Sequence, residues 1–447
     1  MKFIKYLSIL IGIVLASFYL FPFEFLVLPG VNTKMAMAAV GLVIFMVQMA
    51  AGRTSSINYR YLVLVVMALL VSLASLATMV IHNTLDNAYL GYIMTLLVWL
   101  GGAYCLTRWI KLVHGKVSVE LLCNYLITVC VVQCVLALLI DYLPSFKIWV
   151  NTHIGDFGGM GPAAGVDKYD RLYGIGAALD IAGSRFAAVM ILTAAMIRTN
   201  YKFQWLYTAA FLVIGIIGNM IARTTTVGVL LALLVINLPI NTNEDVSSHS
   251  TVQFYYKVLI LLVVMIPIIV YFYNFNPQFR EGFRFGFEGF FSLFETGEWQ
   301  SQSNEILRSM YRFPETAGTW LLGDGYMNNP MGDPYYNGYQ WKGFYMGIDV
   351  GYLRFIYYFG VLGLGIIIYF IVYAAKVCAN KFPKYKWMFV FVLLANMVVW
   401  FKVSTDLLVI FAAFLSISET DLMDPIIDKV SPANNTYEDD LPNSLDV

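Results

Sequence analysis

Long apolar runs are the feature that most constrains this chain of 447 residues. A helix that crosses the hydrocarbon core of a bilayer needs about 20 apolar residues. Runs near that length lie at 6–28, 33–51, 61–81, 89–107, 119–140, 186–198, 204–221, 224–240, 256–273 and 350–375, followed by short runs at 387–401 and 404–418. The sequence therefore predicts an all-α, polytopic integral membrane protein with about 12 transmembrane helices. Hydrophobic residues make up 60% of the chain and charged residues 13%, which excludes a soluble enzyme, a disordered chain and a nucleic-acid-binding protein.

Basic residues fall mainly in every second loop. If the N-terminus lies inside, the predicted cytoplasmic segments carry Lys2, Lys5, Arg53, Arg60, Arg108, Lys111, Lys116, Arg198, Lys202, Lys376, Lys381, Lys384 and Lys386. The short outer loops near 29–33 and 82–88 hold almost no basic charge, Lys34 being the exception. This positive-inside pattern predicts that both termini are cytoplasmic. The last two short runs form either thin helices or a re-entrant hairpin, and both return the chain to the same side.

The polar segments divide the chain into a membrane domain and a tail. Residues 1–418 form the predicted transmembrane domain, with long outer loops at 141–185 and at 274–349, the latter before the tenth run. Residues 419–447 are acidic and are predicted to form a solvated cytoplasmic tail. No internal repeat is visible, which disfavours a transporter built from inverted repeats.

Arginines on the predicted outer side oppose the usual charge distribution, so we expect them to have a function. Arg223 lies in the turn Ala222–Thr224 between two apolar runs, and Thr224, Thr225 and Thr226 open the next helix with hydroxyls and N–H groups. Guanidinium groups bind the oxygens of a phosphate or diphosphate bidentately. The sequence thus predicts an anion site at Arg223, the alternative being an arginine that reaches lipid phosphates.

Further arginines flank this turn. Arg171 precedes a glycine-punctuated segment and is either structural or a ligand, whereas Arg185 is interpreted as an anchor at the membrane boundary. In the long loop, residues 303–312 are predicted to be helical, which would place Arg308 and Arg312 on one face. Later in this loop, tyrosines, amides and a tryptophan suit sugar faces and hydroxyls, the alternative being a turn-rich loop without a ligand: Asn328, Asn329, Asp333, Tyr335, Tyr336, Asn337, Tyr339, Gln340 and Trp341.

Asp349 ends this loop, immediately before the run that contains Tyr352 and Arg354. Its carboxylate is placed either to accept a proton from a sugar hydroxyl or to cap the following helix. Tyr352 and Arg354 are expected to bind substrate. Lys402 and Asp406 are spaced as a structural i,i+4 ion pair at the end of the last hairpin.

With these residues, the chain resembles the bacterial oligosaccharide repeat-unit polymerases of the Wzy type and, in the same superfamily, the O-antigen ligases. The likeness covers most of the chain in topology. It includes four short motifs, namely RLYG at 171–174, ART at 222–224, Arg308 followed by WLLGDG at 320–325, and DVGY at 349–352 followed by FGVLG at 359–363. The resemblance implies a GT-C-like glycosyltransferase in the bacterial cytoplasmic (inner) membrane. Its implied partners are donor and acceptor glycans linked to undecaprenyl diphosphate, membrane lipids and a chain-length regulator, with no cofactor.

The resemblance also implies roles for the site residues. Arginines hold the diphosphate while the acceptor hydroxyl attacks the anomeric carbon. The ligases place a histidine in the long loop near the position of Asp349, but the four histidines here, His82, His114, His153 and His249, all lie outside 274–349. This difference favours a polymerase over a ligase.

The expected chemistry needs only one base, because a lipid diphosphate is already a good leaving group. No Asp-x-Asp motif occurs on the outer side. We therefore expect a metal-independent, inverting transfer with Asp349 as base. Arg223 and Arg308 would hold the diphosphate, assisted by Arg171 and Arg312.

Two other classes compete with this hypothesis. A lipid-linked oligosaccharide flippase would need charged residues along a midplane cavity and comparable halves. A glycoside hydrolase would need two carboxylates that flank one bond, and the sequence cannot pair its acidic residues. The polymerase is ranked first, the ligase second and the flippase third.

Overall fold

The computed structural model describes residues 2–52, 59–155, 171–238, 244–334 and 336–418, so the tail at 419–447 lies outside the described residues. Within these ranges the regular secondary structure consists of helices, which are joined by loops. Strand-like pairing occurs in them only as isolated bridges, such as that between Phe25 and Ile154. Nine of the described helices are long and apolar enough to cross a membrane. They are α1 (Lys2–Leu20), α2 (Thr33–Ala50), α3 (Tyr59–His82), α4 (Tyr92–His114), α5 (Val119–Tyr142), α7 (Leu179–Thr199), α8 (Gln204–Ile221), α10 (Glu244–Phe275) and α15 (Gly351–Lys381).

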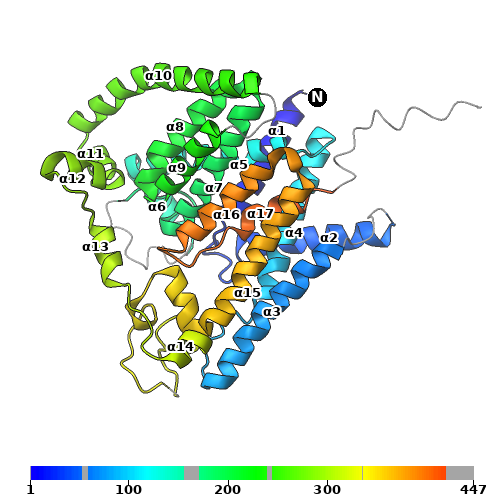
Figure 1. Cartoon of the computed structure of the whole chain (residues 1–447). Helices are drawn as coiled ribbons and strands as arrows, with labels where there is room; N and C mark the ends of the chain where they lie inside the picture. Colours follow the sequence, from blue (N-terminus) through cyan, green and yellow to red (C-terminus); the bar gives the residue numbers. More distant parts are fainter. Residues whose placement is uncertain (1, 53–58, 156–170, 239–243, 335, 419–447) are drawn as a thin grey trace, which may run out of the picture.

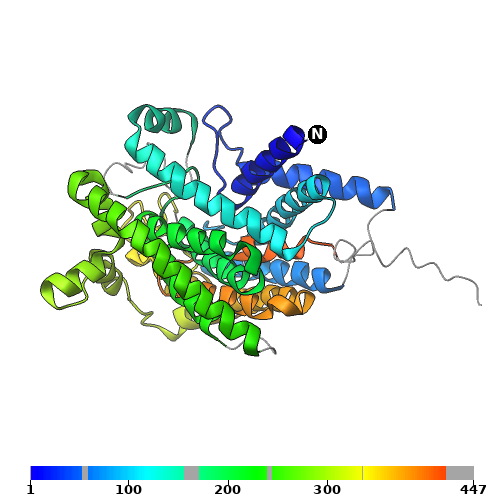
Figure 2. The same cartoon turned by 90° about the horizontal axis from the view of Figure 1, so that it is seen from above.

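The other three predicted runs form shorter helices, α9 (Thr225–Asn237), α16 (Lys386–Val399) and α17 (Leu408–Leu415). All-α architecture and long apolar helices are thus confirmed. Twelve crossings and a GT-C-like fold stay predictions. Figures 1 and 2 show the helices from two sides, with α10 at the edge of the bundle.

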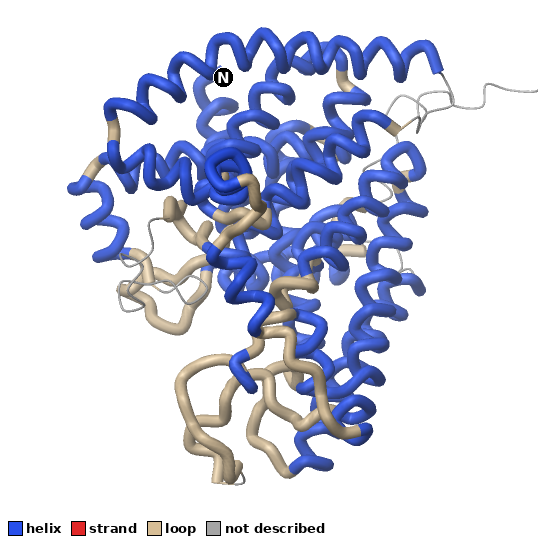
Figure 3. Tube along the Cα trace, turned by 60° about the vertical axis from the view of Figure 1, so that its left-hand side comes forward, coloured by secondary structure: helices blue, strands red, loops and turns tan. Residues whose placement is uncertain are grey.

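The segments predicted to be outer meet at one end of the bundle, the loop-rich end (Figure 3). The long loop forms short helices here, α11 (Pro277–Gly286), α12 (Glu288–Thr296), α13 (Gln302–Ser309) and α14 (Ala317–Leu322), and α6 (Pro144–His153) lies in the preceding outer loop. Gln278 donates to the carboxylate of Asp141 over 2.9 Å, and the backbone N–H of Met327 donates to Asp86 over 2.8 Å. These contacts join loops that are far apart in the sequence.

The segments predicted to be cytoplasmic meet at the opposite end, the basic end. The indole of Trp109 donates to the carbonyl of Ser8 over 3.0 Å, and Lys384 pairs with Glu120 at 3.3 Å. Loops that are predicted to lie on the same side of the membrane are therefore found at the same end of the bundle. Which end is cytoplasmic rests on the positive-inside pattern alone.

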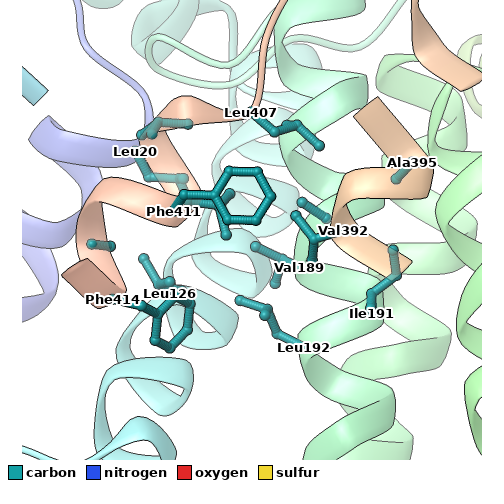
Figure 4. Packing of buried hydrophobic residues seen from close by; sticks show 14 of the residues in the cluster. Leu20, Leu126, Val189, Ile191, Leu192, Val392, Ala395, Leu407, Phe411 and Phe414 are labelled. Atoms are coloured by element: carbon teal, nitrogen blue, oxygen red, sulfur yellow. The ribbon is translucent and has the colours of Figure 1, made fainter. Parts of the chain in front are cut away.

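Helix α7 lies at the centre of the core, where nearly every side chain from Ala182 to Arg198 is buried. Small residues bring its neighbours close, since a Cβ on Gly228 of α9 would lie only 2.2 Å from the Cα of Ala187. Figure 4 shows Phe411 and Phe414 of α17 packed near Leu126 and Leu192. The short C-terminal helices are thus central to the packing of the bundle.

Helix α15 is broken near its start, at Phe359 and Gly360. Gly360 has φ +68°, and a Cβ there would lie 2.1 Å from the carbonyl oxygen of Leu321. The break leaves the carbonyl of Tyr357 to accept the N–H of Asp324 over 2.6 Å. The break therefore joins the two motifs WLLGDG and FGVLG, and it separates a short first segment of α15 from the long remainder.

Helices α16 and α17 form a hairpin whose two ends lie together. Helix α16 begins just after α15, and Lys381 at the end of α15 donates to the carbonyl of Leu415 over 3.1 Å. The tip, residues 400–407, reaches the start of α15, where the N–H of Tyr352 donates to Trp400 over 3.0 Å. With a length of about 12 Å, α17 is too short to cross a core of about 30 Å. Together with the extended residues 403–407, however, the hairpin brings its tip to the segments predicted to be outer, while both of its ends lie at the basic end. The choice between thin helices and a re-entrant hairpin stays a prediction.

Candidate functional site

Two arginines from different loops share one aromatic ring at the loop-rich end. The guanidinium carbon of Arg223 lies 4.4 Å from the ring centre of Phe285 on α11, and that of Arg171 lies 4.6 Å from the same ring. Cation–π contacts of this kind hold guanidinium groups in place without neutralising them. Arg223 occupies the turn between α8 and α9, as predicted.

Glu288, at the start of α12, pairs with Arg223. The other carboxylate oxygen of Glu288 accepts the N–H of Gln302 over 3.1 Å, so one acidic residue connects the turn at Arg223 with α12 and α13. A guanidinium has five N–H donors, and the pair uses Nη1 of Arg223. Glu288 therefore orients Arg223 and lowers the net charge of the arginine pair.

Most of the donors of the three threonines after Arg223 are used within the protein, contrary to the prediction that they face an anion. The N–H groups of Thr225 and Thr226 donate to Ala222 and Arg223 within the turn, over 3.0 Å each. The hydroxyl of Thr226 donates to Asn219 over 2.7 Å. A tight turn consumes these donors because it closes each N–H on a carbonyl three residues earlier. An anion site here would therefore depend mainly on the arginines.

Asp180 and Lys402 connect the arginine pair with the rest of the site. Lys402, from the tip of the last hairpin, pairs with Asp180 of α7 at 2.6 Å. The same carboxylate oxygen accepts the hydroxyl of Thr224 over 2.8 Å. Asp180 interacts electrostatically with Arg171, and both Asp180 and Lys402 interact electrostatically with Asp349. This pair thus lies between the two groups of predicted site residues.

Asp349 pairs with Arg354 at 3.6 Å, across the start of α15. The cap position of α15 is Val350, and no side chain caps the helix there, so the N-cap alternative for Asp349 is not supported. Arg354 also donates to Ser404 and to Asn328, over 3.1 Å each, and stacks on Phe344 at 4.1 Å. Arg354 therefore holds the long loop and the hairpin tip against Asp349.

Burial controls the acidity of Asp349, which lies outside the membrane-spanning segments. Loss of hydration raises its pKa to about 7, Arg354 and Lys402 oppose that rise, and the charge of Asp180 adds to it. A carboxylate with a pKa close to neutrality can accept a proton and still be ionised in a useful fraction of molecules. These properties suit a general base.

A cavity of about 490 Å³ opens beside Arg354. Asn328 and Phe344, which both contact Arg354, line it, together with Asp86, Asp333 and Lys342. The carboxylates, amides and ring face of this wall match the hydroxyls and apolar faces of sugars. The predicted sugar-suited segment thus borders the Asp349–Arg354 pair.

Three predicted site residues are not brought into this cluster by any contact in the part of the chain that the structure describes. Arg308 is exposed on α13. Arg312 donates to the carbonyl of Met346 over 3.3 Å, and the hydroxyl of Tyr352 donates to Met397 over 2.9 Å. The predicted shared helix face of Arg308 and Arg312 is wrong, because α13 ends at Ser309, a few residues before Pro314.

Arg185, which was predicted to be an anchor at the membrane boundary, packs inside the bundle. It is buried two turns into α7, and its guanidinium contacts the rings of Trp99 and Phe21. Lys34 lies 4.8 Å from the same Trp99 ring, and both cations interact electrostatically with Asp406. The predicted pairing of Asp406 with Lys402 is also wrong, because the hairpin tip is extended rather than helical.

Sequence reasoning gave no role in the site to four residues that shape it: Phe285, Glu288, Asp180 and Lys402. Asp180 and Lys402 carried a usable signal, since an ionisable residue at the mouth of an apolar run is seldom without a function. Phe285 and Glu288 carried none, because Arg223, which both contact, lies more than 60 residues away.

Comparisons of the chain with protein-family models, with curated proteins and with solved structures found no match.

Proposed function

We propose that the chain polymerises oligosaccharide repeat units, carried on undecaprenyl diphosphate, into a surface polysaccharide at the outer face of the bacterial cytoplasmic membrane. The observation that carries the proposal is the arginine pair Arg171 and Arg223, linked through Asp180 and Lys402 to Asp349. This arrangement offers cations for a diphosphate and a carboxylate of raised pKa for a hydroxyl. The polymerase is preferred to the ligase because the long loop contains no histidine.

The proposed reaction is a single displacement. The acceptor hydroxyl attacks the anomeric carbon of the donor, its oxygen forms the new glycosidic bond, and its proton passes to Asp349. The bond from the anomeric carbon to the diphosphate oxygen breaks, and its electron pair leaves with the diphosphate, whose charge Arg223 and Arg171 stabilise. Attack opposite the leaving group inverts the anomeric configuration.

The cavity beside Arg354 is the proposed acceptor subsite, since Asn328 and Phe344 in its wall both contact Arg354, the partner of the base. Arg308 and Arg312 stay predicted diphosphate ligands. The proposed reaction uses no metal, because the diphosphate is already a good leaving group and the outer segments of the sequence contain no Asp-x-Asp motif.

The experiment that tests this function is the length distribution of surface polysaccharide in cells with wild-type protein, no protein or Arg223→Ala, at matched membrane levels. Loss of one charge-stabilising donor typically costs about 10²- to 10³-fold in rate, so we expect single repeat units on their usual carrier. Arg284→Ala is the matched control, because Arg284 lies in the same loop but pairs with Glu295 at 2.8 Å.

Other outcomes would assign the chain differently. Long chains that accumulate on undecaprenyl diphosphate in the absence of the protein would indicate a ligase. Repeat units trapped in the cytoplasmic leaflet would indicate a flippase. An unchanged length distribution in Arg223→Ala would refute the assignment of Arg223.

A further inference from the structure

A long apolar groove, separate from the candidate site, lies between α1, α2 and α4. Its volume is about 950 Å³, and none of the residues that line it belongs to the site described above. Aliphatic and aromatic side chains form most of its wall, among them Ile11, Leu15 and Phe18 of α1 and Val40 and Ile44 of α2. Val40 is 52% exposed and Ile11 39% exposed, so the groove opens to the surroundings of the bundle.

Among the described residues, the charged side chains that line this groove lie at one end of it. Arg108 and Lys111, three residues apart on α4 and therefore on one helix face, line it at the basic end. The guanidinium of Arg108 lies 4.7 Å from the ring centre of Tyr104, which holds it at the groove. At the other end the lining residues are uncharged, as at Leu28 and Thr33.

The groove is long enough for a lipid chain. It follows α2 from Thr33 to Gln48, which corresponds to about 22 Å along a helix. One leaflet of a bilayer contributes roughly half of a hydrocarbon core of about 30 Å. An acyl chain that starts at the level of Arg108 can therefore lie within the groove for its whole length.

We infer that this groove binds an anionic phospholipid, with the headgroup phosphate on Arg108 and Lys111 and one acyl chain along α2. Two cations beside an apolar channel complement a molecule with negative charge at one end and a hydrocarbon tail. The lipid would come from the leaflet at the basic end, which the positive-inside pattern assigns to the cytoplasm. This inference does not depend on the proposed function.

Native mass spectrometry of the delipidated full-length protein, titrated with phosphatidylglycerol or phosphatidylcholine, tests the headgroup contact. We expect saturable binding of phosphatidylglycerol, weakened roughly 30-fold in Arg108→Ala/Lys111→Ala, the combined effect of two basic residues on an anionic lipid. Lys376→Ala/Lys386→Ala is the matched control, because it removes two exposed lysines outside the groove and should bind as wild type does.

A second pair of variants tests the acyl chain. Ala36 lines the groove, whereas Ala39 is exposed on α2 outside it. Ala36→Trp should reduce phosphatidylglycerol binding at least tenfold, and Ala39→Trp should leave it unchanged, with equal thermal melting points confirming that both fold. Equal binding of the two lipids, equal loss in both double variants or normal binding in Ala36→Trp would overturn the inference. In a further titration, undecaprenyl phosphate is bound to the protein first and phosphatidylglycerol is added as competitor. If phosphatidylglycerol cannot displace it, the groove holds a polyprenyl chain and the inference is overturned.

Discussion

Asp349 shows how burial and pairing compete at a single residue. Its partner Arg354 lies 3.6 Å away but also donates to Ser404 and Asn328, so its positive charge serves several acceptors. The loss of hydration therefore dominates, and the pKa of Asp349 rises to about 7. In the proposed reaction the ionised form is the active one.

The raised pKa predicts a pH dependence of polymerisation. Because the base must be ionised, kcat/KM should rise about tenfold per pH unit below pH 7 and level off above it. Asp349→Asn should lower the rate by about 10²- to 10⁴-fold, and the rise of kcat/KM between pH 5 and 7 should disappear. Rates of a reconstituted protein between pH 5 and 9 check this, with Glu295→Gln as control. A wild-type profile in Asp349→Asn would show that another group is the base.

A second residue-scale prediction concerns Asp406. Its carboxylate accepts the hydroxyl of Tyr92 and offsets the two cations Arg185 and Lys34 inside the bundle. Removing one member of a buried charge group typically costs about 3–5 kcal/mol. Asp406→Asn should therefore lower the thermal melting point in detergent, and Lys34→Met in that background should recover part of the loss. An unchanged melting point would contradict this role.

Individual site residues were predictable from the sequence where one local feature sufficed. Arg223 was placed correctly in a turn, because two apolar runs with a short polar gap allow little else. Its partner Glu288 lies 65 residues later, and no local pattern indicates such a contact. The pairing of Lys402 with Asp406 failed because i,i+4 spacing brings side chains together only on a helix.

At the scale of elements, the break in α15 explains why two glycine motifs occur together. Gly323 and Gly360 both have positive φ, and a Cβ on either would collide with backbone atoms of the other segment. The sequence showed both motifs but not their contact, which depends on how the long loop folds back. The break also positions the segment that carries Asp349 and Arg354.

Gly360→Ala should therefore disrupt the site from a distance. The added Cβ would lie 2.1 Å from the carbonyl oxygen of Leu321, and alanine rarely adopts φ +68°. We expect a lower melting point and loss of polymerisation. Gly365→Ala is the matched control, because nothing lies within 4 Å of a Cβ there and alanine favours the helix by up to about 1 kcal/mol. Equal behaviour of the two variants would contradict the importance of the break.

At the scale of the whole molecule, the all-α architecture with long apolar helices was the most predictable property. Apolar length and charge bias respond to the bilayer rather than to other parts of the chain, so they can be read locally. The lateral arrangement could not be predicted in this way, since it depends on close contacts such as Gly228 with Ala187. The hairpin of α16 and α17 was left as one of two alternatives, because run length alone does not show where a short helix ends.

The most direct test of the central claim is polymerisation by the purified protein in liposomes that contain only undecaprenyl-diphosphate-linked repeat units from the source organism. The account predicts longer lipid-linked glycans, one undecaprenyl diphosphate released per bond formed, inversion at the new linkage and no loss of rate with a metal chelator. Arg223→Ala should form at most about 1% of the wild-type product, and Arg284→Ala should match wild type. Wild-type protein that leaves the repeat units unchanged, or that only moves them between leaflets, would contradict the account.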